Sequence, residues 1–240
     1  VRKDISDGKI ESAQEKLELV LREDSEFEEA KETLGKLEES RKMDFLRLIP
    51  RKVGREVLLF KKDTLVFGRP DGGGKIDVGI EHPKVSRVHM RVSLLEDKVV
   101  VEDLGSTNGT YLRGESIRLS EVEDGDIINL ARVYQMTVHI PRGKVPLRTT
   151  ISGTQPSRGT SKEGPPKAVV LEARDRFYVM LKERVGIDFS SAGIQFKEGT
   201  PYGLLVKNGA FLFNEGDRYE LLVPGKSIEV RGIKYRVGGK

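Results

Sequence analysis

The 240-residue sequence contains no cysteine and only three histidines. The absence of cysteine excludes disulfides, thiolate zinc sites and a cysteine nucleophile. His82, His89 and His139 are too few for a multi-histidine metal site, so we expect neither a metal nor a cofactor. A cysteine-free chain suits a reducing compartment, and we therefore expect a cytoplasmic protein.

Long apolar runs and blocks of one charge are also missing. No run approaches the roughly 20 apolar residues that a membrane-spanning helix needs, and the first residues lack the basic and apolar segments of a signal peptide. The net charge is +4, with 33% charged and 37% hydrophobic residues, a composition typical of globular proteins. Because the surplus of Lys and Arg is spread along the chain, nucleic acid is not expected as a partner.

Residues 1–45 are expected to form a helical hairpin. Leucines recur at spacings of three or four residues among Glu and Lys, as Leu17, Leu21, Leu34 and Leu37. Asp24 and Ser25 interrupt this pattern and offer capping side chains for a second helix. Glu28 follows Ser25 by three residues, which predicts a capping box between them.

The stretch GKIESAQEKLELVLREDSEFEEAKETLG also resembles a tetratricopeptide repeat. Several residues occupy the positions at which this family places its packing side chains. They are Gly8, Ala13, Leu17, Val20, Leu21, Asp24, Ala30, Leu34 and Gly35. Such repeats need neighbours to bury a core, and the chain starts with Val1, so a fragment of a longer protein is one expectation. An ordinary helical hairpin packed on the following domain is the other, and the sequence leaves both open.

From Phe45 to His139 the apolar period changes from that of a helix to that of a strand. The segments EVLLF, TLVFG, HMRVSLL, KVVVED, GTYLRG, DIINL and YQMTVHI are short and rich in Val, Ile, Leu and Tyr. Turn signals such as PDGGGK, GSTNG and EDGD separate them. This pattern predicts an all-β sandwich over residues 46–142, and hence a mainly β chain, rather than a parallel α/β sheet.

Residues 143–167 lose this periodicity and are rich in Gly, Pro, Ser, Thr and basic residues. We expect a flexible basic linker there. Strand signals return after Lys167, in AVVLEA, FYVMLK, GIQF, YGLLVK, AFLF, RYELLV, SIEV and KYRV. They predict a second, smaller β domain over residues 168–240.

Three short signatures in the first β region place polar side chains at predicted loops. They are Gly68-Arg69, Ser86-Arg87-Val88-His89 and Ser106-Thr107-Asn108-Gly109-Thr110, and Gly125-Asp126 follows them. Loops at one end of a sandwich converge even when they are far apart in sequence. We therefore expect five of these residues to share one site, namely Arg69, Ser86, Arg87, Thr107 and Asn108.

The chemistry of this set favours an anion. It offers two guanidinium groups, two hydroxyls and an amide, with no carboxylate. Charge-assisted donors of fixed geometry are what a tetrahedral phosphate dianion requires. Catalysis is not expected, because Ser86 and His89 are an odd number of positions apart at the start of a strand and would point to opposite faces. A serine nucleophile would also need a third, orienting group and an oxyanion hole.

In order and spacing, the four signatures resemble those of a forkhead-associated (FHA) domain. That family shows Gly-Arg, Ser-x-x-His, Asn-Gly and Gly-Asp on an eleven-stranded β-sandwich. The resemblance covers about residues 46–142, and DLGSTNGTYL at 103–112 is especially typical. It implies non-catalytic recognition of phosphothreonine peptides.

The resemblance also implies a role for each site residue. Arg69 and Ser86 would contact the phosphate, and Arg87 would lie beside it, on the phosphate or the peptide backbone. Thr107 would support the phosphate or the threonine methyl pocket, and Asn108 would hold the peptide main chain. Structural roles are implied for Gly68, His89 and Gly109, with the histidine hydrogen-bonded to loop backbone.

Short segments of the second β region resemble the same signatures less closely. KNGAFL at 207–212 resembles TNGTYL at 107–112, and Gly216-Asp217 resembles Gly125-Asp126. SAGIQF at 191–196 stands where Ser-x-x-His would fall but has no histidine. A degenerate FHA-like sandwich and an unrelated small β-barrel both stay open.

Together these patterns predict a phosphothreonine-dependent adaptor in Ser/Thr-kinase-linked signalling or assembly, with further protein partners at the helical hairpin. The competing hypothesis is a phospho-independent scaffold or assembly protein. A phosphorylated linker threonine is a further candidate ligand, because a tethered ligand reaches an effective concentration of about millimolar. The linker threonines are Thr149, Thr150, Thr154 and Thr160.

Overall fold

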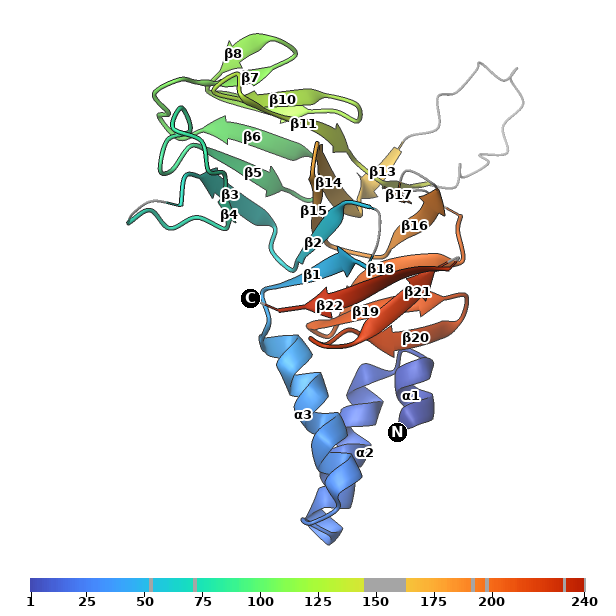
Figure 1. Ribbon diagram of the computed structural model, residues 1–240. Coiled ribbons are helices and arrows are strands. Elements are labelled where there is room, and N and C mark those ends of the chain that lie inside the picture. Colours follow the sequence, from blue (N-terminus) through green and yellow to red (C-terminus); the bar gives the residue numbers. More distant parts are fainter. Residues whose placement is uncertain are drawn as a thin grey trace, which may run out of the picture.

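The computed structural model describes residues 1–51, 54–70, 73–144, 163–190, 193–196, 199–230 and 232–239 (Figure 1). Strands dominate these residues and three helices precede them, which confirms the predicted mainly β class. Most of the predicted linker lies outside the described residues, including Thr149, Thr150, Thr154 and Thr160.

The helices are α1 (Arg2–Ser6), α2 (Ile10–Glu23) and α3 (Glu28–Lys42). The predicted hairpin is present as α2 and α3, but the predicted capping box is wrong. Phe27 is the N-cap of α3, and no side chain caps this helix, because Ser25 lies two residues before the cap position. None of the described helices is long and apolar enough to cross a membrane.

The described strands form three large sheets and a two-stranded ribbon of β12 (Arg142–Lys144) and β13 (Glu163–Pro166). The long sheet has the order β21 (Ser227–Val230), β22 (Ile233–Gly238), β1 (Phe45–Pro50), β2 (Glu56–Phe60), β15 (Arg176–Leu181), β14 (Ala168–Ala173), β11 (Tyr134–His139), β10 (Ile127–Leu130), β7 (Thr110–Leu112) and β8 (Glu115–Ile117). The first outer sheet has the order β4 (Val78–Gly79), β3 (Thr64–Gly68), β5 (Met90–Leu94), β6 (Val99–Asp103) and β9 (Leu119–Val122). The second outer sheet has the order β17 (Gly193–Phe196), β16 (Val185–Ser190), β18 (Tyr202–Lys207), β19 (Ala210–Glu215) and β20 (Arg218–Leu221).

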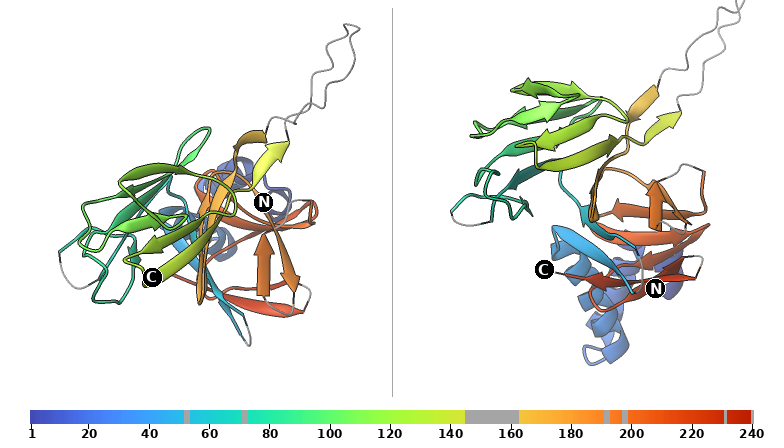
Figure 2. Two further views of the ribbon diagram at one scale, coloured as in Figure 1. Left: turned by 90° about the horizontal axis from the view of Figure 1, so that it is seen from above. Right: turned by 45° about the horizontal axis from the view of Figure 1, so that its top comes forward.

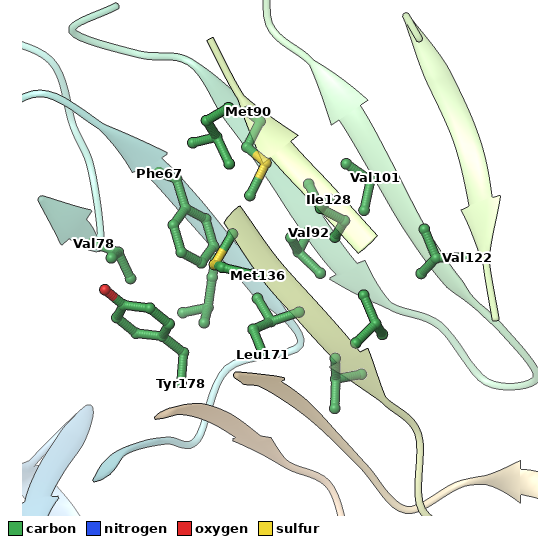
Figure 3. Packing of buried hydrophobic residues seen from close by; sticks show 14 of the residues in the cluster. Phe67, Val78, Met90, Val92, Val101, Val122, Ile128, Met136, Leu171 and Tyr178 are labelled. Carbon is green, nitrogen blue, oxygen red and sulfur yellow. The ribbon is translucent and has the colours of Figure 1, made fainter. Parts of the chain in front are cut away.

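The first outer sheet packs on β15, β14, β11, β10, β7 and β8 of the long sheet, and we call this unit the first sandwich. Figure 3 shows its core, where Phe67, Met90 and Val92 of the outer sheet meet Ile128 and Met136 of the long sheet. All five side chains are fully buried. Met90 and Val92 occupy alternate positions of β5, so the period of two in the sequence places both on the same face.

The second outer sheet packs on β2, β1, β22 and β21, and we call this unit the second sandwich. Its core contains Leu48 of β1, Phe211 of β19 and Tyr235 of β22. The views of Figure 2 show the two sandwiches on opposite sides of the central strands of the long sheet.

Strand β14, in the middle of the long sheet, is buried on both faces. Val169 and Leu171 belong to the core of the first sandwich, whereas Ala168 and Val170 belong to the core of the second. Strands that are buried on both faces read as continuous apolar runs. The run AVVLEA therefore reflects a strand that two cores share.

Hydrogen bonding within the long sheet links parts of the chain that are far apart. Strand β11 pairs with β14, with Val138 opposite Leu171. Strand β1 pairs with β22, with Leu48 opposite Val237, and β2 pairs with β15 in parallel. The sheet thus runs across the predicted boundary between residues 46–142 and 168–240, and that division into domains stays a prediction.

The helical hairpin lies on the outer face of the second outer sheet (Figure 1). Ile10 of α2 and Leu37 of α3 are fully buried and pack with Leu205 and Leu212 of that sheet. The hairpin and the second outer sheet therefore share a small hydrophobic core. This packing is what we expect of an ordinary helical hairpin that rests on the following domain.

Lys61 ties the end of α3 to both β regions. Its ammonium donates to the carbonyl oxygens of Ser40 at 3.1 Å and Arg41 at 2.8 Å, and to that of Gly209 at 2.8 Å. The two α3 carbonyls lie at the negative end of the helix dipole, where a cation is stabilising. Burial lowers the pKa of this ammonium.

Candidate functional site

Loops at one end of the first sandwich surround an open cavity of about 570 Å³. The lining residues are Arg69, Gly73, Gly74, Pro83, Lys84, Val85, Ser86, Arg87, Val88, Gly105, Thr107 and Asn108. All five residues expected to share a site are among them, so the fold brings together three segments that are distant in sequence. The described residues of the lining carry three cations and no carboxylate.

Arg69 is the first residue after β3. Its backbone amide donates to the carbonyl oxygen of Ser86 at 2.9 Å, and its Nη1 donates to the carbonyl oxygen of Pro83 at 3.1 Å. Both bonds join the end of β3 to the loop between β4 and β5. They hold the partly exposed guanidinium group at the cavity wall.

Ser86, Thr107 and Asn108 connect the two other loops across the cavity. Ser86 Oγ accepts a hydrogen bond from the Thr107 amide at 3.0 Å and donates to Thr107 Oγ1 at 3.5 Å. Asn108 Nδ2 donates to the carbonyl oxygen of Lys84 at 2.8 Å. Two hydroxyls and an amide are thus placed side by side, and Arg87 is exposed next to them.

The buried side chain of His89 connects these two loops. Its imidazole is fully buried, its Nδ1 accepts a hydrogen bond from the Ser86 amide at 3.1 Å, and its Nε2 lies 3.2 Å from the carbonyl oxygen of Gly109. Because Nδ1 accepts from a backbone amide, the proton of the neutral ring must be on Nε2, which donates. One side chain therefore fixes the spacing between the β4–β5 and β6–β7 loops.

The geometry around His89 is also incompatible with a Ser–His catalytic pair. The histidine contacts the backbone amide of Ser86, whereas the hydroxyl of Ser86 contacts Thr107. A general base must lie within hydrogen-bond reach of the hydroxyl that it activates. Ser86 therefore presents its hydroxyl to the cavity, and His89 shapes the loop beneath it.

Gly68 and Gly109 are glycines for two different reasons. A Cβ atom on Gly68 would lie 2.1 Å from the carbonyl oxygen of Arg87, so the close approach of β3 to the β4–β5 loop needs glycine. Gly109 has φ +75°, in the left-handed region that glycine adopts without strain.

Sequence reasoning missed two residues of the site. Asp103 accepts hydrogen bonds from the Ser106 amide at 2.8 Å, from Ser106 Oγ at 2.6 Å and from Thr110 Oγ1 at 2.7 Å. Burial alone would raise the pKa of this carboxyl group, but these hydrogen bonds lower it. An Asp two residues before a Gly is a recognisable turn signal, and the Gly105 amide donates to Asp103 Oδ1 at 3.0 Å. Lys84, which adds a cation to the cavity, gives no such signal.

The fourth signature, Gly125-Asp126, lies away from the cavity. The Asp126 carboxylate accepts hydrogen bonds from Arg113 Nε at 2.6 Å and from the Glu123 amide at 2.8 Å. It therefore shapes the turn between β9 and β10.

Stability should fall as the pH drops below about 6.5, the ordinary pKa of histidine, because of His89. Burial lowers the pKa of its imidazole, which outweighs the opposite effects of the Gly109 carbonyl and the Asp103 carboxylate. Above about pH 6.5 both folded and unfolded states hold a neutral ring, but below it the unfolded state takes up the proton first. Thermal unfolding should therefore give a lower melting temperature at pH 5.5 than at pH 7.5. His89→Gln should make this difference in melting temperature smaller. The matched change His82→Gln, at a partly exposed ring, should keep the wild-type pH slope; equal slopes in all three proteins would contradict the assignment.

The FHA domain family model matches residues 65–131, which run from the second residue of β3 to just past β10 and include every loop that lines the cavity. The chain contains an FHA domain. The FHA domain is a non-catalytic interaction module that recognises phosphopeptides. The matched residues lie within the first sandwich, and the predicted recognition of this family is confirmed.

Solved structures similar to the chain include FHA domains. A domain from work on phosphothreonine-dependent FHA domain interactions is 25% identical, with the match covering 37% of this chain and 88% of that one at a TM-score of 0.29. The FHA domain of the CT664 protein from Chlamydia trachomatis has the same identity, coverage and TM-score. EmbR of Mycobacterium tuberculosis, in complex with a low-affinity phosphopeptide, is 26% identical over 49% of this chain and 32% of its own, at a TM-score of 0.31. No curated protein matches the chain.

Proposed function

We propose that this chain is a phosphothreonine-peptide recognition protein that acts as an adaptor in Ser/Thr-kinase-linked signalling or assembly. The observation that carries the proposal is the composition of the cavity at the end of the first sandwich, which we call the FHA cavity. Arg69, Ser86, Arg87, Thr107 and Asn108 line it together, and no described residue of the lining is acidic. A phosphate dianion of about −1.5 to −2 charge would find only donors and cations there.

In this proposal each side chain serves one part of the ligand. Arg69 and Ser86 bind phosphate oxygens, since a guanidinium plane can offer two parallel donors. Arg87 and Thr107 complete the phosphate site, and Asn108 binds the peptide backbone. Val88 also lines the cavity, and we assign its side chain to the threonine methyl group, which phosphoserine lacks.

Fluorescence anisotropy with an oriented phosphothreonine peptide library tests the proposal. We expect binding of phosphothreonine peptides, weaker binding of the matching phosphoserine peptides and no binding of the unphosphorylated ones. Equal binding of phosphorylated and unphosphorylated peptides would favour the alternative, a phospho-independent scaffold. That alternative also requires partners that stay bound after phosphatase treatment.

Two further parts of the proposal concern partners and location. We assign protein contacts of the adaptor to the exposed surface of the helical hairpin, and we place the protein in the cytoplasm, in keeping with its lack of cysteine. A phosphorylated linker threonine as a ligand of its own FHA domain stays a prediction, because Thr149, Thr150, Thr154 and Thr160 lie outside the described residues.

A further inference from the structure

The two sandwiches are built in the same chain order. In the first half, the hairpin β1–β2 is followed by β3, β4, β5 and β6, later by β9, and finally by the hairpin β10–β11. In the second half, β14–β15 is followed by β16, β17, β18, β19, β20 and the hairpin β21–β22. The outer sheets then have matching strand orders, β4-β3-β5-β6-β9 and β17-β16-β18-β19-β20. The one difference in direction is that β4 runs parallel to β3, whereas β17 runs antiparallel to β16.

A shared hydrogen-bond pattern supports this equivalence. The Gly125 amide donates to the Val138 carbonyl at 2.8 Å, and the Val138 amide donates to the Asp126 carbonyl at 2.8 Å. One hundred residues later, the Gly225 amide donates to the Val237 carbonyl at 2.9 Å, and the Val237 amide donates to the Lys226 carbonyl at 2.7 Å. Both glycines have φ +86°. The turn before β10 and the turn before β21 are therefore the same structural feature.

The matching glycine turns show that the sequence similarities noted for the second β region join positions that do not correspond in the structure. Asn208-Gly209 is the tight turn between β18 and β19, with Lys207 paired to Ala210, whereas Asn108-Gly109 belongs to the loop before β7. Gly216-Asp217 joins β19 to β20, so the true counterpart of Gly125-Asp126 is Gly225-Lys226. The short sequence similarities therefore fall at positions that are not structurally equivalent.

Given this equivalence, each sandwich contains the opening hairpin of the other half. The closing strand β11 of the first half pairs with β14 of the second half, and the closing strand β22 of the second half pairs with β1 of the first. The hairpin β14–β15 also fills the core of the first sandwich, where Tyr178 meets Phe67 edge-on with ring centroids 5.5 Å apart (Figure 3). The hydroxyl of Tyr178 lies 2.9 Å from that of Tyr134 in β11.

We propose that the chain is an internal pair of FHA-type sandwiches that have exchanged their opening hairpins, so that residues beyond 168 complete the sandwich that carries the cavity. Three observations carry this inference: the matching strand orders, the shared glycine turn, and the pairing of each closing strand with the hairpin of the other half. The second sandwich keeps the fold without the site. His89, which directly precedes β5, has its counterpart in Pro201 directly before β18.

Four equivalent positions allow a test on the full chain. Thr137 lies opposite Glu172 in β11 and β14, and Ile49 lies opposite Arg236 in β1 and β22. Neighbouring Cα atoms of antiparallel strands are about 4.5 to 5.5 Å apart, within disulfide range. Because the chain has no cysteine, a pair of introduced cysteines can react only with each other or with a second copy.

The pairs T137C/E172C and I49C/R236C should lose their free thiols under mild oxidation and stay monomeric on a non-reducing gel. The pairs I49C/T137C and E172C/R236C use the same positions but would meet only without the exchange, so they should keep their thiols. The reverse pattern would overturn the proposal. Covalent dimers from the first two pairs would also overturn it, since the exchange would then occur between copies.

Hydrogen exchange of the unsubstituted chain gives a second test. If the sandwiches share their hairpins, the amides of β11 and β22 should open with the same free energy, as parts of one cooperative unit. Two clearly different opening free energies would contradict the exchange. Neither test uses a phosphopeptide, so the outcome is independent of the proposed binding function.

Discussion

Replacing Arg69 with alanine should abolish binding of phosphothreonine peptides in the anisotropy experiment. Hydrogen bonds to charged groups contribute about 1.5–3 kcal/mol each, so losing a two-bond guanidinium contact costs about 3 kcal/mol or more. Since each 1.4 kcal/mol corresponds to about tenfold in affinity, a weakening of at least about 100-fold follows. The measurement is the dissociation constant of one phosphothreonine peptide selected from the library.

Two matched variants separate charge from geometry. Arg69→Lys keeps the positive charge but loses the planar pair of donors, so its affinity should fall between those of the wild type and Arg69→Ala. Arg22→Ala removes the same charge from an exposed position on α2, away from the cavity, and should bind as the wild type does. Wild-type affinity in Arg69→Ala would show that the site assignment is wrong.

Replacing Gly68 with alanine should damage both stability and binding. The new Cβ would lie 2.1 Å from the carbonyl oxygen of Arg87, and backbone atoms on both sides must move apart. This movement pulls on the bond between the Arg69 amide and the Ser86 carbonyl at 2.9 Å. Overpacking of this kind costs about 1–3 kcal/mol, and the displaced loop carries Ser86 and Arg87 away from Arg69.

Denaturant unfolding and peptide anisotropy together measure this effect. The control is Gly35→Ala in α3, where an added Cβ meets nothing within 4 Å. Alanine is more favourable than glycine inside a helix by about 0.5–1 kcal/mol, so the control should be slightly more stable and bind normally. If Gly68→Ala unfolds at the wild-type denaturant concentration, the close approach of β3 to the β4–β5 loop is not a feature of the protein in solution.

Several strands could be predicted from sequence because their apolar period is local. Strands β2, β3, β14, β18 and β21 coincide with EVLLF, TLVFG, AVVLEA, YGLLVK and SIEV. Strands β1, β4, β8, β9, β12, β13 and β16 were not predicted, and β13 lies within the predicted linker. β4 has two residues and β8 has three, too few to show a period, and β8 exposes two of its three residues.

The five main residues of the site could be predicted from the sequence, but two residues that support them could not. The spacing of Gly68-Arg69, Ser86-Arg87 and Thr107-Asn108 indicates one anion site, and the fold places all of them around one cavity. The roles of Asp103 and Lys84 could not be predicted in this way. Their contributions depend on where loop amides and carbonyl groups lie in space.

The sequence by itself therefore determined the mainly β class, the helical hairpin and the five polar residues that line one cavity. Only the tertiary structure decided which hairpin completes which sandwich. Every strand offers the same backbone donors and acceptors, and β1, β2, β14 and β15 are all rich in apolar residues. Their partners are chosen by long-range packing against two cores, and a local apolar pattern carries no information about which closing strand, β11 or β22, each hairpin will meet.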